Sequence, residues 1–294
     1  MLRKIYFLLI LLITSCAPAK QTAPPALITW QDIAAMPTPA YDAQIKYGTE
    51  ASQFGELRLP AGKGKFPVVV VVHGGCWLSA YNLQYMSHVS EALRKAGYAT
   101  WNIEFRRVGE TGGGWPGTFQ DVAAGTDYLR ELAKKYPLDL DRVAVIGHSA
   151  GGHLALWLAA RTNLKQSSPL YSADPLPING VVTLAGITDL KTYSEAEGSC
   201  NSAVEKLIGG SATQFPERYA EASPIELLPL QTPVRLVQGA KDPIVPVSQA
   251  ESFATKAGNS AEVILLDQAG HFELVAPQSE GWPKIKKALD KLLN

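Results

Sequence analysis

The sequence has little cysteine and no excess of either charge. Only 3 of its 294 residues are cysteine, which is too few for a small domain held together by disulfides. The 27 basic residues equal the 27 acidic ones, and no basic stripe runs along the chain, so we expect neither nucleic acid nor another polyanion as a partner. Hydrophobic residues make up 46% of the chain. That is enough to bury one large core, and we predict a single folded domain.

A hydrophobic run long enough to span a membrane is also missing from the N-terminus. The run over residues 5–13 has 9 residues, whereas a spanning helix needs roughly 20. Arg3 and Lys4 precede this run, and Thr14 and Ser15 follow it. The arrangement is typical of a secretion signal, and we predict a signal peptide over residues 1–15.

The signal ends in Ile13-Thr14-Ser15-Cys16, which resembles the lipobox of bacterial lipoproteins. The resemblance implies that Cys16 is acylated and anchors the protein to a membrane of the cell envelope. We expect residues 16–29, rich in proline and alanine, to form a flexible tether. By resemblance to lipoproteins of Gram-negative bacteria, Ala17 after the cysteine indicates the outer membrane, facing the periplasm. The alternative is ordinary cleavage near Ala17 or Ala19, which would release a soluble protein.

From residue 30 onward, short apolar segments alternate with segments of helical periodicity. Residues 44–47 and 53–59 alternate between apolar and polar side chains and predict an antiparallel pair. The later strands are apolar on both faces, as in a sheet covered by helices on both sides. This alternation predicts an α/β fold with a doubly wound, mostly parallel sheet. Thr118 and Asp121 resemble a capping box at the start of one helix. We expect further strands at 66–72, 98–103, 143–146, 181–185, 234–239 and 263–266, and helices at 83–96, 118–135, 152–160 and 279–293.

The segment Gly147-His148-Ser149-Ala150-Gly151 lies between a buried strand and a helix. So sharp a turn places its serine in strained dihedrals and needs small residues two positions to either side, and both are glycine here. We therefore predict a nucleophile elbow with Ser149 as the nucleophile. The backbone N–H of Ala150, at the start of the helix, would point towards an oxygen that becomes negative during attack on a carbonyl.

A serine hydroxyl needs a base to take its proton, and the chain has 5 histidines. We choose His271, because it lies on a glycine-opened loop after the last strand, at the edge where open α/β sheets place their chemistry. His148 flanks the serine but is expected to be aimed elsewhere by the turn. For the carboxylate that orients the base we choose Asp242, after the strand at 234–239. Asp189, which follows the preceding strand, is the main rival.

A second glycine-rich loop, His73-Gly74-Gly75-Cys76-Trp77, follows a buried strand. Consecutive glycines let backbone N–H groups approach an anion without interference from side chains. We assign the oxyanion hole to the amides of Gly75, Cys76 and Ala150, with Gly74 as a further candidate. For His73 we expect the role of bracing this loop rather than that of the base.

These motifs together resemble the α/β-hydrolase superfamily, and the likeness covers essentially everything from residue 40 onward. The closer likeness is to the branch of kynurenine formamidases, hormone-sensitive-lipase-like carboxylesterases and bifunctional feruloyl and acetyl-xylan esterases. It implies an α/β-hydrolase domain over residues 30–294 and a triad in the chain order Ser149, Asp242, His271. A triad of this kind requires no metal and no organic cofactor.

The same resemblance bears on how substrate would be held. Trp77 and Trp115 would border the cleft as substrate-binding residues, the alternative being a buried packing role for either. Residues 192–228 are long enough for a small cap but not for a full lid domain. Lipase-like members carry a third glycine where this chain has Cys76, and formamidases usually carry a tyrosine there.

We predict a serine hydrolase that cleaves carboxylic ester bonds of small or carbohydrate-linked substrates through an acyl-enzyme. One alternative is an amide or formamide hydrolase, including a peptidase, that uses the same residues. Another is a lipid-tethered binding protein that has the fold without turnover.

An oxidising compartment would permit a disulfide between Cys76 and Cys200, which would tie the glycine-rich loop to a later segment. The sequence predicts no particular oligomeric state.

Overall fold

The computed structural model describes residues 26–293. The predicted signal peptide, Cys16 and most of the predicted tether at 16–29 lie outside the described residues. The end of that tether segment is described, and it already contacts the domain. The side chain of Ile28 packs against the hydrophobic core, and its amide donates a hydrogen bond to Glu273.

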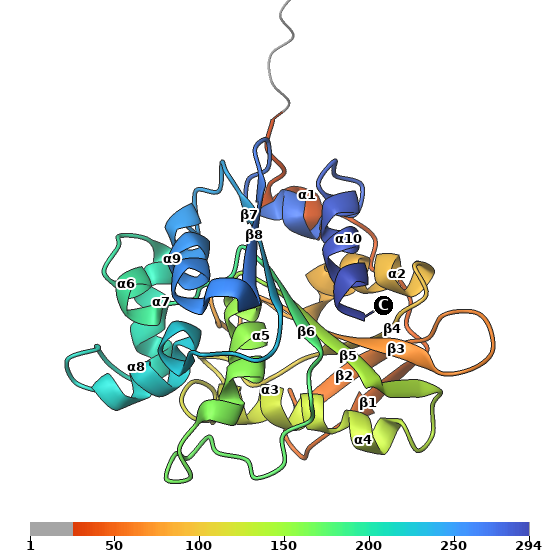
Figure 1. Ribbon diagram of the computed structural model, residues 1–294, viewed down its shortest axis with the longest axis horizontal. Coiled ribbons are helices and arrows are strands. Elements are labelled where there is room, and N and C mark those ends of the chain that lie inside the picture. The colour runs from red at the N-terminus through yellow and green to blue at the C-terminus, as the bar shows by residue number, and fades with distance from the viewer. Residues whose placement is uncertain (1–25, 294) are drawn as a thin grey trace, which may run out of the picture.

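An eight-stranded sheet runs through the centre of the domain (Figure 1). The first two neighbour pairs across it are antiparallel, and all the others are parallel. The predicted mostly parallel sheet with an antiparallel N-terminal pair is therefore confirmed. Across the sheet the strands follow in the order β1 (Ala43–Lys46), β2 (Phe54–Arg58), β4 (Ala99–Ile103), β3 (Phe66–Val72), β5 (Leu138–His148), β6 (Gly180–Leu184), β7 (Val234–Gly239) and β8 (Ala261–Leu266).

Burial follows position in the sheet. In β3 all five residues from Val68 to Val72 are fully buried, because helices cover both faces of this central strand. At the edge, β1 alternates between half-buried and exposed residues. The elbow strand β5 begins at Leu138, earlier than the predicted 143. Its first residues include the charged Asp139 and Arg142, so the apolar pattern revealed only its buried end.

Helices cover both faces of the sheet (Figure 1). On one face lie α2 (Ser87–Lys95) and the C-terminal α10 (Trp282–Leu293), and on the other lie α3 (Gly117–Asp127), α5 (Ala150–Ala160) and α9 (Val247–Ala257). Two further helices are the N-terminal α1 (Trp30–Ala34) and the short α4 (Leu129–Leu132). Short 3-10 helices occur at η1 (Leu83–Met86), η2 (Arg161–Asn163), η3 (Pro224–Leu227), η4 (Gly258–Ser260) and η5 (Phe272–Val275).

The helix predicted over 118–135 is in fact the two helices α3 and α4, and its predicted capping box is wrong. The Thr118 hydroxyl donates to the carbonyl of Arg106 at 2.6 Å and accepts the amide of Gly114 at 3.0 Å. Asp121 forms an ion pair with Arg106 at 2.7 Å. Both side chains therefore hold the preceding loop, and α3 begins without a side-chain cap.

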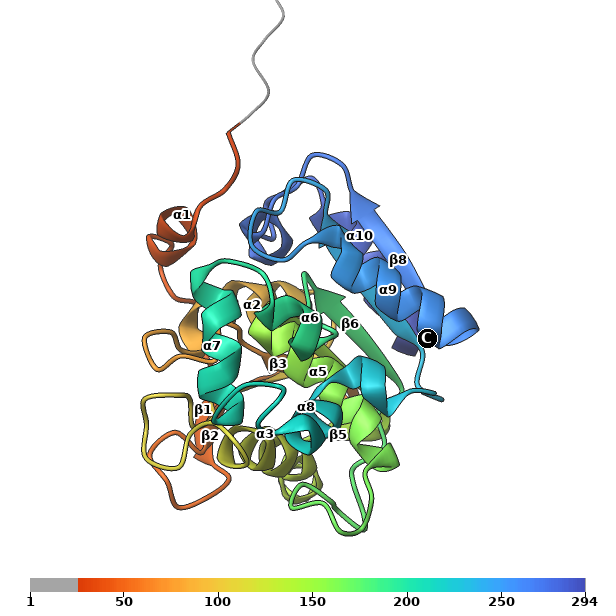
Figure 2. The ribbon, with the colours of Figure 1, turned by 90° about the vertical axis from the view of Figure 1, so that its left-hand side faces the viewer.

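The segment predicted to form a small cap carries three helices, α6 (Leu190–Ser194), α7 (Ser199–Ile208) and α8 (Pro216–Ala222), which lie together on one side of the domain (Figure 2). Trp157 of α5 donates its indole N–H to the carbonyl of Glu221 in α8 at 2.9 Å. The cap is thus fastened to the helix that follows the elbow.

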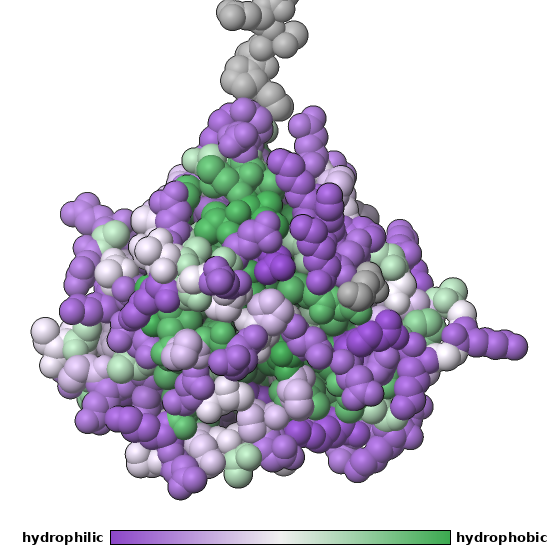
Figure 3. Space-filling model, in the orientation of Figure 1, coloured by the Kyte–Doolittle hydropathy of each residue, from purple (hydrophilic) through white to green (hydrophobic). Residues whose placement is uncertain are grey.

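Polar residues cover most of the face shown in Figure 3, and hydrophobic residues gather near its apex, where β7 and β8 lie. Leu265 of the edge strand β8 is one of the few large hydrophobic residues that are exposed. Between residues 26 and 293, no helix combines the length and the apolar content needed to cross a membrane.

Candidate active site

Ser149 stands at the junction of β5 and α5, as the elbow requires. Its backbone has φ 55° and ψ −121°, a strained conformation for a residue with a side chain. The flanking glycines are dictated by space, because a Cβ on Gly147 would lie 2.1 Å from the carbonyl oxygen of Gly151. A Cβ on Gly151 would lie 2.2 Å from the carbonyl oxygen of Val72 in the neighbouring strand. Only glycine lets the chain turn here and present the serine.

His271 and Asp242 meet, although 28 residues of chain separate them. Their side chains come together at 2.7 Å between Nδ1 of His271 and Oδ2 of Asp242. The other carboxylate oxygen of Asp242 accepts the amides of Ile244 and Val245 at 2.8 and 3.0 Å, and Gln238 donates to Oδ2 at 3.2 Å. Asp242 is therefore fixed by its own loop, with one oxygen aimed at the imidazole.

Asp189, the rival acid, has a different task. Its carboxylate accepts the backbone amides of Lys191 and Thr192 at 3.0 and 3.3 Å. It thereby caps the start of α6. Of the two candidate carboxylates, Asp242 is the one that contacts His271.

One cavity of about 300 Å³ contains both Ser149 and His271 in its wall. We refer to it as the Ser149 cavity. No hydrogen bond joins these two side chains in the described structure, and hydrogen bonds between a nucleophile and its base are often long before substrate binds. The wall consists of Trp30, Gln31, Gly75, Cys76, Tyr81, Tyr85, His148, Ser149, Cys200, Ile244, His271 and Phe272.

The loop assigned to the oxyanion hole borders this cavity in an unusual backbone conformation. Gly75, Cys76 and Trp77 have φ of 95°, 52° and 57°, which is strained for the last two. Gly75 and Cys76 line the cavity, whereas the Gly74 amide donates to the Tyr85 hydroxyl and is not free for an oxyanion. The amide of Ala150 opens α5, directly after the serine.

A disulfide joins Cys76 of this loop to Cys200 of the cap helix α7, with 5.0 Å between their Cα atoms. Both residues line the Ser149 cavity. The pairing that the sequence left open is therefore present. It covalently connects the predicted oxyanion loop to the cap.

His148 contributes to the site although its ring nitrogens bond Tyr85 and His271 rather than Ser149. Its ring lies 4.4 Å from that of His271, measured between centroids. Burial, and then the charge of His271, lower the pKa of His148 well below the ordinary value, so the ring is neutral. Nε2 donates to the carbonyl of His271 at 3.1 Å, which leaves Nδ1 to accept from the Tyr85 hydroxyl at 3.3 Å. Since Tyr85 also accepts the Gly74 amide, one hydrogen-bonded chain links the two loops on either side of Ser149.

His73 braces the glycine-rich loop from below. Its Nδ1 donates to the carbonyl of Gly74 at 2.9 Å, and its Nε2 contacts the Glu104 carboxylate at 2.7 Å. Burial by itself raises the pKa of Glu104, but the charge and hydrogen bond of His73, together with Arg107, bring it below the ordinary value. Glu104, which lies at the end of β4 beside the loop, is not among the residues predicted from the sequence.

The structure corrects the prediction that Trp77 and Trp115 bind substrate. Trp77 is fully buried and donates its indole N–H to Nδ1 of His153 at 3.2 Å. Trp115 packs edge-on against Phe119 at 5.6 Å and lies near the Arg218 guanidinium, outside the wall of the Ser149 cavity. Both tryptophans serve packing, which was the alternative.

Other aromatic residues line the cavity instead. Trp30 of α1 packs edge-on against Tyr81 and Tyr85, at centroid distances of 5.0 and 5.4 Å, and lies 6.1 Å from Phe272. These residues are not predicted from the sequence, because no motif connects a tryptophan near the N-terminus to a serine in the middle of the chain.

The site as a whole has the groups that acyl transfer needs. It combines a hydroxyl on a strained turn, an imidazole held by a carboxylate, and backbone amides beside the same cavity. Among residues 26–293, no group of three or more histidine, cysteine, aspartate or glutamate side chains is arranged to hold a metal ion.

Similarity to curated proteins extends over most of the chain. It is 28% identical over 242 residues to esterase LipC of Mycobacterium tuberculosis, covering 79% of this chain and 57% of that protein. It is 26% identical over 253 residues to a probable isoprenylcysteine alpha-carbonyl methylesterase of Arabidopsis thaliana, covering 81% of this chain and 52% of the relative. The chain spans about half the length of the curated relatives it matches.

Solved structures share the fold. A truncated carbohydrate esterase from gut microbiota superposes with a TM-score of 0.74 at 23% identity, covering 87% of this chain and 98% of that one. An inhibited esterase B from Lactobacillus rhamnosis gives a TM-score of 0.74 at 22% identity, covering 88% and 90%. The predicted α/β-hydrolase fold is confirmed. The BD-FAE family model matches residues 56–257, more than half of the sequence, and the chain belongs to the BD-FAE family.

Proposed function

We propose that this protein is a serine hydrolase that cleaves carboxylic ester bonds. The Ser149 oxygen bonds to the ester carbonyl carbon while His271 takes its proton. His271 then gives that proton to the departing alcohol as the ester C–O bond breaks. Water, activated by the same imidazole, releases the acid from the acyl-enzyme. The observation that carries this proposal is the hydrogen-bonded Asp242–His271 pair, whose imidazole shares a cavity with Ser149.

The remaining groups act on the charge that develops during attack. Asp242 keeps the imidazole in the required tautomer and stabilises its protonated form. The amides of Gly75, Cys76 and Ala150 would hold the oxyanion, and each such donor contributes about 3 kcal/mol to a transition state. Water-poor surroundings strengthen these interactions, and Ser149 and His271 are only 4% and 5% exposed.

The proposed substrates are small or carbohydrate-linked esters. The relatives named above are described as an esterase and a probable methylesterase, and one of the solved structures is a carbohydrate esterase. The Ser149 cavity, at about 300 Å³, is at the lower end of the range for small-molecule sites. That volume suits a short acyl group better than a long one.

The test is hydrolysis of p-nitrophenyl acetate and butyrate by the full chain in non-ionic detergent, beside Ser149→Ala. We expect the variant to lose at least about 10³-fold in kcat. Labelling with a fluorophosphonate should require Ser149. Equal rates for the two proteins would refute the assignment. Including N-formylkynurenine and a peptide amide in the panel tests the amide alternative, because faster turnover of either than of any ester would replace the ester proposal.

We further propose that the protein is a lipoprotein of the bacterial cell envelope, anchored through Cys16. The support is the sequence Ile13-Thr14-Ser15-Cys16 behind a basic and apolar signal. Expression with a labelled fatty acid should give a labelled wild-type protein that partitions into detergent. Cys16→Ser should be unlabelled. Release of unlabelled wild-type protein into the periplasm would favour ordinary cleavage instead.

A further inference from the structure

A second cavity of the described chain is larger than the Ser149 cavity. A cavity of about 990 Å³ lies between the segment Pro37–Asp42, the outer face of α2 and the start of α10. We call it the Trp282 cavity. It shares no residue with the Ser149 cavity. A smaller cavity of about 170 Å³ lies between them. It shares Trp30, Tyr81 and Tyr85 with the Ser149 cavity and His88 with the Trp282 cavity. The two larger cavities are therefore neighbours around α1.

The wall of the Trp282 cavity is pre-formed. Arg58, which is fully buried, donates to the carbonyls of Pro39 and Ala40 at 3.1 and 3.0 Å. Asp42 accepts the amide of Leu59 at 2.6 Å. Proline at 37, 39 and 277 further restricts the backbone of the rim. A ligand that enters such a site loses little affinity to ordering of the protein.

The charges around the cavity already neutralise one another. Glu91 accepts from the Arg94 guanidinium at 2.7 and 2.8 Å and lies 3.5 Å from the Lys95 ammonium. Burial, followed by the charge of Arg58, lowers the pKa of His88, so this ring is neutral at neutral pH. With Asp42 opposite Lys95, the lining carries as many acidic as basic groups. An uncharged ligand suits this site better than a polyanion or a cation.

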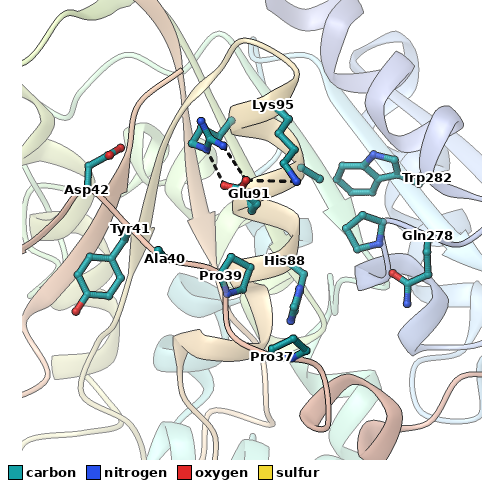
Figure 4. A pocket seen from close by; sticks show the side chains of 13 residues that line it. Pro37, Pro39, Ala40, Tyr41, Asp42, His88, Glu91, Lys95, Gln278 and Trp282 are labelled. Carbon is teal, nitrogen blue, oxygen red and sulfur yellow. Dashed lines mark hydrogen bonds and ion pairs between the residues drawn. The ribbon is translucent and has the colours of Figure 1, made fainter. Parts of the chain in front are cut away.

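Two aromatic rings flank these polar groups. Figure 4 shows Tyr41 and Trp282 at opposite sides of the cavity, with His88 and Glu91 of α2 between them. Tyr41 is 44% exposed, the largest exposed fraction among the large hydrophobic residues of the described chain. Gln278 adds an amide that can both donate and accept. Aromatic faces for C–H groups beside donors and acceptors for hydroxyls are the complement of a sugar ring.

We propose that the Trp282 cavity is a second, non-catalytic site that binds a segment of a neutral polysaccharide. A polymer held there would keep its other residues close to the Ser149 cavity and raise their local concentration. The site requires no hydrolysis, so it stands independently of the ester-hydrolase proposal.

The test uses affinity electrophoresis of the full chain in non-ionic detergent, in a Ser149→Ala background so that the polymers stay intact. The gels contain arabinoxylan, galactomannan, mixed-linkage β-glucan or, as an anionic polymer, polygalacturonate. We expect at least one neutral polymer to retard the protein and polygalacturonate not to. Tyr41→Ala and Trp282→Ala should each weaken retardation about three- to tenfold, as expected for the loss of one aromatic contact.

The matched control is Tyr171→Ala, because Tyr171 is also exposed, at 38%, but lies outside the cavity. It should leave retardation unchanged. Tyr41→Ala should unfold in urea at the wild-type midpoint, which shows that the fold is intact. Three results would overturn the proposal: no neutral polymer retards the protein, polygalacturonate binds more tightly than any neutral polymer, or Tyr171→Ala weakens retardation as much as Tyr41→Ala. If ester hydrolysis is absent but retardation depends on Tyr41, only the ester-hydrolase proposal fails.

Discussion

Two sides of the Ser149 cavity are built in different ways. On one side Ser149 and His271 project from the ends of β5 and β8, and each lies within a few residues of a strand end and a glycine. On the other side Trp30 comes from the N-terminal α1 and Cys200 from the cap helix α7. The chemistry thus depends on short local motifs at the sheet edge. The shape offered to substrate depends on segments that reach the cavity only through tertiary packing.

The sheet side should be far more sensitive to single substitutions. Asp242→Asn keeps the size of the side chain but removes the charge that orients His271, and we expect a loss of about 10⁴-fold in kcat. Asp189→Asn is the matched control, because Asp189 caps α6 and does not contact His271. Its kcat for p-nitrophenyl butyrate should stay at the wild-type value. If the two substitutions exchanged these effects, Asp189 would be the acid.

The contact between His153 of α5 and the cap predicts that stability depends on pH. Burial lowers the pKa of His153 from 6.5 to about 4, while Nε2 of this ring donates to the carbonyl of Ala222 in the cap at 2.9 Å. The unfolded chain binds this proton below about pH 6.5, but the folded chain binds it only near pH 4. The contribution of neutral His153 to the free energy of unfolding is therefore complete above pH 6.5. It is lost as the pH falls towards 4, which lowers the free energy of unfolding by about 3 kcal/mol.

Urea unfolding at pH 7 and pH 4 measures this change in the free energy of unfolding. His153→Gln keeps a donor and an acceptor without titrating, so the loss of unfolding free energy between the two pH values should be about 3 kcal/mol smaller in the variant. Buried His148 changes stability in the same direction in both proteins and cancels from the comparison. The same loss in both proteins would show that His153 does not carry the effect.

The two sides of the Ser149 cavity also differ in how well they can be predicted from the sequence. The elbow is recognisable because the strained turn demands glycine at 147 and 151. For the carboxylate that orients His271, the sequence offers both Asp242 and Asp189, because each follows a strand. Only their tertiary contacts distinguish them. Trp77 was misplaced because a tryptophan beside a loop looks the same in sequence whether its indole faces a cleft or finds a buried acceptor such as His153.

His148 lies between the two sides, and its effect should be intermediate. Its Nε2 holds the carbonyl of His271, so His148→Ala should let the imidazole shift and lower kcat about 10- to 100-fold. Because the group touches no reacting atom, KM should change little. His148→Gln, which retains an N–H donor, should recover part of the loss. A variant that changes KM alone would instead place His148 in contact with substrate.

The far side of the cavity should control substrate range rather than rate. Trp30, Tyr81 and Tyr85 form a partition between the Ser149 cavity and the neighbouring one of about 170 Å³. Tyr85 holds the Gly74 amide and Tyr81 packs against Gly75, so Trp30 is the member that can be removed without disturbing the oxyanion loop. Trp30→Ala should join the two spaces and admit longer acyl chains.

The measurement is the ratio of kcat/KM for p-nitrophenyl octanoate to that for the butyrate. Each methylene newly buried contributes about 0.8 kcal/mol, so accommodating one or two of the four extra methylenes raises this ratio roughly 4- to 15-fold. Gln31→Ala is the control, because Gln31 lines the Ser149 cavity but not the neighbouring one, and its ratio should stay unchanged. Since an unfolded variant loses both activities together, a rise in the ratio can only come from a wider site. An unchanged ratio in an active Trp30→Ala protein would mean that the partition does not limit the acyl chain.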